Sequence, residues 1–367
     1  MSRLSEPHVL LDRNENRYGP APGCRAVLGD VSSEVLFNYS RDFQRGHKSE
    51  LSKRLAQVHG VEEPRIVLGY GCEDLLKQAV HHWLRPGERC FIPSASWWYY
   101  RAIADEVDGL TVEYPMVERP TGYDFDVDAL LALHARRRAR LLLLSTPNNP
   151  TGNAFPFERL REVLDGFRDA MVVLDEAYFG LGDAPAPDLA PLLEDCPNLL
   201  VLRSFSKLYG LAGARIGYGI AGRGLGSFLQ FSARNLGFSR LSERLATAAL
   251  DDPGYYDGVR RAFARDRQRY YEALRPYSGV RVYDSQANFV LVRFPDGVAA
   301  PLREALKARG LVLKFFSGEP AFESCARVTL GTEQENTAVI AALQELLPQM
   351  LQPSRPHVPR DRGEAAE

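Results

Sequence analysis

The chain has 367 residues, of which 45% are hydrophobic and 25% are charged, as is ordinary for a globular enzyme. This length predicts one large and one smaller structural unit rather than a single compact core. The formal net charge of −2 gives no electrostatic basis for binding nucleic acid or a membrane surface. The N-terminal residues carry charges within their only apolar stretch, so we expect neither a signal peptide nor a transmembrane helix.

Cysteine usage gives a second set of expectations. The five cysteines are scattered, form no CxxC pair and have no histidine at the spacing of metal ligands. This pattern predicts reduced thiols in a cytoplasmic protein and argues against a structural zinc, so no metal is expected.

The first expected element is an irregular N-terminal arm, because residues 11–29 are polar and rich in glycine and proline. Short apolar runs bounded by glycine, proline or polar residues then alternate with helical patterns, which predicts strands buried on both faces. The expected helices include Glu73–Leu84 and Phe157–Phe167. The expected strands are Arg65–Gly69, Arg89–Pro93, Leu110–Pro115, Leu141–Ser145, Met171–Asp175, Leu199–Arg203 and Ile216–Ile220. The alternation predicts an α/β fold with a mainly parallel seven-stranded sheet covered on both sides.

The pattern changes after Gly222. One long helical stretch is expected to about Leu250 and another over Tyr255–Leu274. Expected strands Val280–Tyr283, Asn288–Phe294, Leu311–Phe315 and Ala326–Leu330 follow, with helices near Ala300–Arg309 and Glu333–Leu347. We therefore expect an arm (1–40) that can pack with a small C-terminal α+β domain (246–350), a large domain (41–245) and a disordered tail (351–367).

The most informative stretch is SFSKLYGLAGARIGY, residues 204–218, which follows an expected strand. A lysine that only decorates a surface loop would explain neither the hydroxyls and arginine beside Lys207 nor the glycines. A lysine that forms a Schiff base needs a sheltered site that lowers its pKa. A phosphate anchor needs hydroxyls, backbone amides and an arginine, and Ser204, Ser206 and Arg215 supply such groups at short range.

Two further motifs stand at the ends of expected buried strands, where α/β sheets bind ligands. TPNNPTG spans residues 146–152, and alone it would be an ordinary Pro/Asn/Gly turn. DEAY spans residues 175–178, and Asp175 alone could be a helix N-cap. The order of all three motifs favours one shared site.

Together these motifs resemble the fold-type I enzymes that use pyridoxal 5′-phosphate (PLP), and within them the class of histidinol-phosphate aminotransferase. The resemblance spans about residues 8–348. RVTLGT at residues 327–332 and NENRYGP at residues 14–20 are similar to the histidinol-phosphate branch. The resemblance implies PLP as the cofactor and a homodimer whose active sites are completed across a two-fold interface.

The resemblance also implies roles for individual residues. Lys207 would bond covalently to PLP and act as general acid and base, while Asp175 would keep the pyridine nitrogen protonated. Asn149 and Tyr178 would hydrogen-bond the ring O3′ oxygen. The implied phosphate site comprises Ser204, Ser206, Arg215, the backbone amides of Gly71, Cys72 and Glu73, and Tyr39 from a neighbouring subunit.

The implied substrate-binding set is Arg327, Lys314, Asn288, Tyr18 and Trp97. Arg327 would bind a substrate carboxylate or phosphate through a bidentate fork, the alternative being a structural surface ion pair. Asn288 would assist Arg327 or cap a turn.

Three positions depart from the family pattern. Ala95 stands where an aromatic ring usually stacks on PLP; either Trp97 or Trp98 replaces that ring, or the aromatic run only packs a helix against the core. Lys314 stands where an arginine usually helps to bind substrate phosphate, and lysine lacks the planar fork. Arg17 replaces a common proline.

The expected function is therefore transfer of an amino group between a donor, either an amino acid or an amino-alcohol phosphate, and a 2-oxo acid. The departures favour a donor other than histidinol phosphate, in specialised amino-acid biosynthesis. The alternative keeps the fold and changes the bond broken, as in a PLP-dependent decarboxylase or oxidase related to threonine-phosphate decarboxylase. A third hypothesis, a sensor domain of a transcriptional regulator, lacks space for a helix-turn-helix module.

Overall fold

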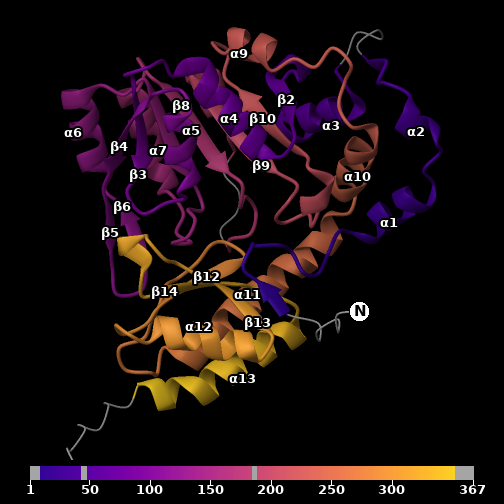
Figure 1. The fold of residues 1–367 in the computed structure, drawn as a ribbon. Helices are drawn as coiled ribbons and strands as arrows, with labels where there is room; N and C mark the ends of the chain where they lie inside the picture. The colour runs from indigo at the N-terminus through magenta and orange to yellow at the C-terminus, as the bar shows by residue number, and fades with distance from the viewer. Residues whose placement is uncertain (1–8, 43–47, 184–187, 352–367) are drawn as a thin grey trace, which may run out of the picture.

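The computed structural model describes residues 9–42, 48–183 and 188–351, and the expected disordered tail lies outside them apart from residue 351. Two main sheets organise the described chain (Figure 1). The larger sheet has seven strands in the order β2-β10-β9-β8-β7-β3-β4, and the smaller has five in the order β1-β13-β14-β12-β11. Among the described helices, none is both long enough and apolar enough to cross a membrane.

The seven-stranded sheet confirms the expected α/β fold class. Its strands are β2 (Ile66–Gly69), β3 (Arg89–Pro93), β4 (Leu110–Tyr114), β7 (Leu141–Ser145), β8 (Met171–Glu176), β9 (Leu199–Ser204) and β10 (Gly217–Ala221). Only β10 runs antiparallel to its neighbours, β2 and β9. Every residue of β7, β8 and β9 is buried, as the apolar runs predicted.

Alternate side chains of the central strands enter two separate cores. Leu142, Leu144 and Val172 pack in one core, whereas Leu141 and Leu143 pack in the other. The first core includes residues of α3 (Glu50–His59), α6 (Val127–Arg137), α7 (Phe157–Gly166) and α8 (Ala190–Asp195). The second includes residues of α4 (Cys72–Trp83), α5 (Tyr99–Asp105) and α9 (Gly226–Phe231). The two-residue period of a strand thus buries both faces of the sheet.

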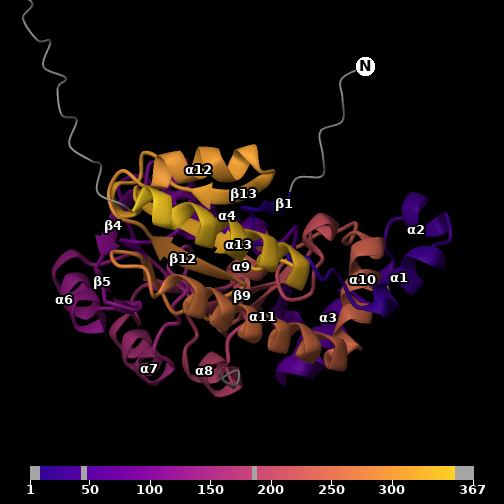
Figure 2. The same cartoon turned by 90° about the horizontal axis from the view of Figure 1, so that it is seen from below.

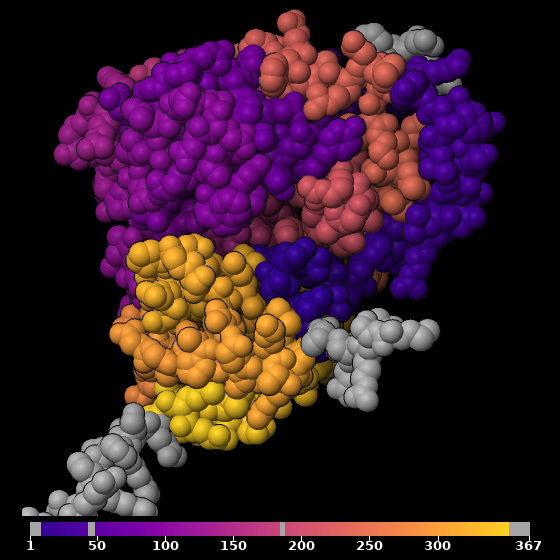
Figure 3. Space-filling model, in the orientation of Figure 1, coloured from indigo at the N-terminus to yellow at the C-terminus, as the bar shows by residue number. Residues whose placement is uncertain are grey.

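The second sheet forms the C-terminal α+β unit. Its strands are β1 (Val9–Leu11), β11 (Arg281–Val282), β12 (Phe289–Arg293), β13 (Leu311–Phe315) and β14 (Cys325–Thr329). The helices α11 (Pro253–Leu274), α12 (Ala299–Ala308) and α13 (Glu333–Met350) lie with it (Figure 2). β1 pairs parallel with β13, so the N-terminal segment contributes a strand to this sheet. Figure 3 shows the indigo N-terminal segment lodged where the purple and orange units meet.

Several sequence expectations were wrong or incomplete. The expected continuous helix after Gly222 is broken into α9 and α10 (Arg240–Leu250), because Gly237 has a φ of +78° and Ser239 caps α10 through the Ser242 amide. The arm is not wholly irregular: besides β1 it holds α1 (Pro22–Gly29), which starts at a proline, as helices often do, and α2 (Glu34–Phe37) follows. The hairpin of β5 (Met116–Glu118) and β6 (Tyr123–Phe125) was not expected. Short 3₁₀ turns occupy Glu63–Arg65, Ala212–Ala214 and Pro320–Phe322.

Candidate active site

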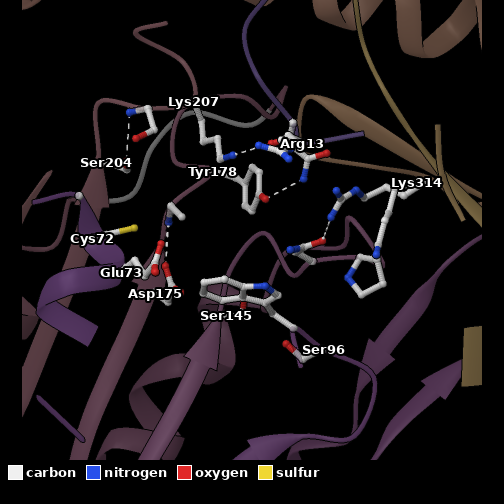
Figure 4. A pocket seen from close by; sticks show the side chains of 18 of the residues that line it. Arg13, Cys72, Glu73, Ser96, Ser145, Asp175, Tyr178, Ser204, Lys207 and Lys314 are labelled. Atoms are coloured by element: carbon white, nitrogen blue, oxygen red, sulfur yellow. Dashed lines mark hydrogen bonds between the residues drawn. The ribbon is translucent and has the colours of Figure 1, made fainter. Parts of the chain in front are cut away.

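A cavity of about 530 Å³ lies at the carboxyl ends of β7, β8 and β9 (Figure 4). The arm, the start of α4, the end of β13 and the middle of β14 complete its walls. The expected site residues that line it are Gly71, Cys72, Glu73, Trp97, Asn149, Asp175, Tyr178, Ser204, Ser206, Lys207, Arg215, Lys314 and Arg327. The chain therefore brings together the motifs at residues 146–152, 175–178 and 204–218, which are far apart in sequence.

Lys207 follows β9 and reaches across the cavity toward the arm. Its Nζ donates a 3.1 Å hydrogen bond to the backbone oxygen of Arg13 and stands 5.5 Å from the centre of the Tyr178 ring (Figure 4). Burial, reinforced by the positive charge of Arg327, lowers the pKa of Lys207 to about 8. A lysine with a pKa near neutrality supplies the uncharged amine that attacks a carbonyl carbon.

Asp175 is the residue before the last of strand β8, and both of its carboxylate oxygens accept hydrogen bonds. Oδ2 accepts a 2.7 Å hydrogen bond from the Tyr100 hydroxyl, and Oδ1 accepts a 3.0 Å bond from the Ala177 amide. Burial raises the pKa of Asp175, whereas these two hydrogen bonds lower it. No described helix begins after β8 until α8 at residue 190, so Asp175 is not a helix N-cap.

An anion cup forms where α4 begins. Gly71 precedes the helix with a φ of +86°, and a Cβ there would stand 3.0 Å from Nη2 of Arg215. The absence of that side chain lets the Arg215 guanidinium approach the free amides of the helix N-terminus. Ser204 Oγ accepts a 3.0 Å bond from the Ser206 amide on the same side. Helix amides, serine hydroxyls and a guanidinium together suit a phosphate group.

Arg327 enters the cavity from β14. Its Nη1 donates to Asn149 Oδ1 at 2.5 Å and its Nη2 donates to the backbone oxygen of Asp12 at 2.7 Å. Its buried Nε has no hydrogen-bond partner within the described chain. Arg327 is 8% exposed and forms no ion pair with a described carboxylate, so it is not a surface ion pair. Lys314 is its neighbour in the β13–β14 register.

Three expected site residues lie outside the cavity. The Tyr18 hydroxyl donates to Asp266 at 3.2 Å, away from the cavity. Asn288 is fully buried and donates to the backbone oxygen of Asn14 at 3.0 Å, without contacting Arg327. Tyr39 is 70% exposed and does not reach the cavity of its own chain, so its contact with a neighbouring subunit stays a prediction.

Arg17, which stands where the family commonly has proline, forms an ion pair with Glu335 at 2.7 Å.

The aromatic run after β3 is divided between two environments. Ala95 is buried in a cluster with Tyr123 and Tyr283 and does not line the cavity. Trp97 and Trp98 both line it, and Trp97 also packs against Tyr100. The packing of Trp97 on Tyr100 agrees with the second alternative, and the replacement of the stacking ring by Trp97 or Trp98 stays a prediction.

Sequence reasoning missed several residues that line the cavity, and three of them lie close to the expected site residues. Tyr100, Arg13 and Asn14 line the cavity, and Tyr100 and Asn14 bind Asp175 and Tyr178 directly. The NENRYGP run, which includes Asn14, was the only signal for the arm. Nothing in the sequence distinguishes Tyr100 from its aromatic neighbours.

The residues fit PLP: a cup for its phosphate, a carboxylate for its ring nitrogen and a lysine of lowered pKa stand in one cavity. The sequence model for aminotransferase class I and II matches residues 7–343. The chain belongs to the class I and II aminotransferases, and it is a PLP-dependent enzyme.

Within this class, the chain is similar to proteins of two named kinds. The histidinol-phosphate aminotransferase of Anaeromyxobacter sp. (strain Fw109-5) is 33% identical over 92% of this chain and 90% of its own. A crystal structure of histidinol-phosphate aminotransferase from Sinorhizobium meliloti in complex with PLP has a TM-score of 0.82 and 28% identity, covering 94% and 92% of the two chains. L-threonine-O-3-phosphate decarboxylase from Porphyromonas gingivalis shares the fold, with a TM-score of 0.76, 21% identity and coverage of 93% and 99%.

Proposed function

We propose that this aminotransferase takes an α-amino acid as donor and a 2-oxo acid as acceptor, and that Arg327 binds the carboxylate that both carry. The observation behind this proposal is the buried guanidinium of Arg327, whose Nε has no partner among the described residues. An unpaired buried donor is costly, and a carboxylate is the ligand that an arginine fork binds best. Burial also lowers the pKa of Arg327 because it disfavours the charged guanidinium, and an arriving anion would offset that effect.

Other residues of the cavity would hold PLP and move the proton during the reaction. PLP, when bound, supplies an electron sink for the negative charge that develops at the substrate α carbon. Lys207 Nζ removes and returns the proton at that carbon, since a pKa of about 8 allows either direction near neutral pH. Asp175 holds a proton on the ring nitrogen. Asn149, anchored by Arg327, and Tyr178 flank the position proposed for the ring oxygen.

Histidinol phosphate is the second candidate donor. It is favoured by Lys314, which adds a positive charge beside Arg327, and by the identity to histidinol-phosphate aminotransferases. Lysine presents a point charge where a phosphate is best bound by a planar fork, and Glu319 lines the same cavity. We therefore rank α-amino acids first, in a specialised biosynthetic role.

The test follows each half-reaction by the visible absorbance of the bound cofactor. Single amino acids and histidinol phosphate are added to the purified enzyme, and 2-oxoglutarate is added afterwards. Loss of the band with an α-amino acid, release of the matching 2-oxo acid and recovery of the band with 2-oxoglutarate would support the proposal. Turnover of histidinol phosphate at an ordinary enzymatic rate, with none of the amino acids, would overturn it. Release of carbon dioxide or peroxide would instead indicate a decarboxylase or an oxidase.

We also propose that a second copy of the chain covers an exposed apolar surface near α2. Leu36, Tyr39, Tyr70 and Leu236 line one hollow there, and each is at least 48% exposed. Contiguous exposed apolar groups of this kind mark association surfaces. Light scattering should give a dimer for the wild type and a monomer for Leu36→Asp with Leu236→Asp. Phe157→Asp, at an exposed residue of α7, is the matched control, and a monomeric wild type would contradict the proposal.

A further inference from the structure

We infer that Asn14 is a positioning residue, which fixes the Tyr178 hydroxyl as a hydrogen-bond donor toward the interior of the cavity. The inference deepens the aminotransferase function and rests on PLP binding beside Tyr178. It assigns a role to an arm residue that contacts neither Lys207 nor Asp175.

The backbone of Asn14 is clamped by the second sheet. Asn14 is 1% exposed and has a φ of +55°, in the left-handed region that asparagine tolerates better than most residues. Its amide nitrogen donates to Thr329 Oγ1 at 3.0 Å, and its carbonyl oxygen accepts from Asn288 Nδ2 at 3.0 Å. The end of β14 and the residue before β12 therefore hold this point of the arm.

The side-chain amide of Asn14 has one consistent orientation. Thr329 Oγ1 donates to Asn14 Oδ1 at 3.1 Å, and Asn14 Nδ2 donates to Tyr178 Oη at 2.8 Å. With the amide turned over, two donors of Asn14 would face Thr329 Oγ1. The Thr329 hydroxyl proton, which is also buried, would then have no acceptor on Asn14. The buried threonine thus selects the orientation in which asparagine donates to tyrosine.

This orientation of Asn14 determines where the single hydroxyl proton of Tyr178 points. Because its oxygen accepts from Asn14, that proton is free to be donated on the cavity side. Phe289 packs edge-on against the ring, with centres 5.2 Å apart, and so limits its rotation. The charged or titratable groups that act on Tyr178 are Arg327, Asp175 and Cys72, with Lys207 over its ring. Burial raises the pKa of Tyr178 above its ordinary value, so the hydroxyl keeps its proton at neutral pH.

A donor facing the phenolic oxygen of the bound cofactor stabilises the deprotonated form of that oxygen. It therefore lowers the pH midpoint at which the visible band of the bound cofactor changes. If Asn14 were replaced by a group that accepts from Tyr178, the tyrosine proton would turn away from the cavity. The midpoint would then rise.

Asn14→Asp replaces the amide nitrogen that donates to Tyr178 by a carboxylate oxygen that accepts from it, with almost no change in shape. Aspartate also tolerates a positive φ. We expect the absorbance midpoint to rise by about one pH unit, a tenfold change in proton affinity. The dissociation constant of PLP, measured by equilibrium dialysis, should rise in parallel. Asn14→Gly, which keeps the backbone conformation and adds no charge, should give a smaller rise of the same sign. Circular dichroism of each apoprotein checks that the variants fold.

The same substitutions in a Tyr178→Phe background separate orientation from added charge. If Asn14 acts through the tyrosine hydroxyl, the Asn14→Asp shift falls by more than half in that background. An equal shift with and without the hydroxyl, or an unchanged midpoint in both Asn14 variants, would overturn the inference. A wild-type protein with no visible band on adding PLP would be a different failure, that of the cofactor itself.

Discussion

The hydroxyl of Tyr100 donates a 2.7 Å hydrogen bond to Oδ2 of Asp175, and both side chains are buried. Tyr100 comes from α5, which packs on one face of the large sheet, and Asp175 comes from the end of β8 within that sheet. Burial alone would favour the neutral acid. The tyrosine favours the charged form, which is the form that can hold a proton on a ring nitrogen.

We expect Tyr100→Phe to weaken PLP binding about tenfold, because a hydrogen bond to a buried charged group is lost. In the wild type this hydrogen bond lowers the pKa of Asp175, so its loss in the variant raises that pKa. As the pH falls, the variant should therefore lose PLP at a higher pH than the wild type. Equilibrium dialysis from pH 5 to 8 measures both effects. Tyr99→Phe is the matched control from the same aromatic run. Equal losses in the two variants would contradict the assigned role.

The lowered pKa of Lys207 predicts how the apoprotein takes up PLP. Only the neutral amine attacks the aldehyde, so the rate of uptake should rise with pH and level off above the folded-state pKa of about 8. An ordinary lysine would still be gaining rate well above pH 9. Rapid mixing of apoprotein with PLP between pH 6.5 and 10 measures the midpoint. Arg327→Met removes a positive charge that lowers this pKa and should move the midpoint upward.

Arg327 and Lys314 should have separable effects on substrate choice. Arg327→Lys keeps the charge but loses the fork, so kcat/KM for an amino-acid donor should fall about 100-fold. Lys314→Arg should raise kcat/KM for histidinol phosphate about tenfold and leave amino-acid donors nearly unchanged. Steady-state rates with both kinds of donor test the pair. If Lys314→Arg changes kcat/KM for neither donor, Lys314 does not contribute to substrate specificity.

A buried ion pair behind β8 should matter for stability. Arg203 Nε donates to Glu176 Oε2 at 2.7 Å, both residues are buried, and the guanidinium also covers the Phe179 ring. Glu176→Gln should lower the free energy of unfolding by about 3 kcal/mol, because it leaves a buried charge without its partner. Glu345→Gln breaks the exposed pair with Arg309 and should change the free energy of unfolding far less, because solvent screens an exposed ion pair. Urea unfolding of the two variants compares them.

The elements that the sequence predicted well share a local signal. Leu141–Ser145 consists of four leucines closed by a serine, and it is β7 without any shift of its bounds. Lys207 and Asp175 follow such runs, so their place at one edge of a parallel sheet follows from topology. The cavity-lining residues of the motifs at residues 146–152, 175–178 and 204–218 were predictable because these motifs stand at strand ends.

What could not be predicted depends on contacts between distant segments. Asn14 meets Tyr178 across 164 positions and Thr329 across 315 positions. Tyr18 stands in an irregular stretch, where no periodicity indicates the direction of a side chain, and it points to Asp266 instead of the cavity. The break before α10 was missed because apolar residues continue through residues 228–238. Gly237 and the Ser239 cap mark the break.

The pairing of β1 with β13 also sets the order in which the enzyme can be completed. Val9 lies opposite Leu311, so the first described strand leaves the ribosome some 300 residues before its partner. Until β13 and β14 have been synthesised, the arm has no sheet to join, and Arg13 is not held where its carbonyl receives Lys207. The large sheet can form early, whereas the arm is held beside Lys207 only near the end of translation. A nascent chain stalled before residue 311 would therefore carry every cofactor-phosphate group of the cup and still lack a finished active site.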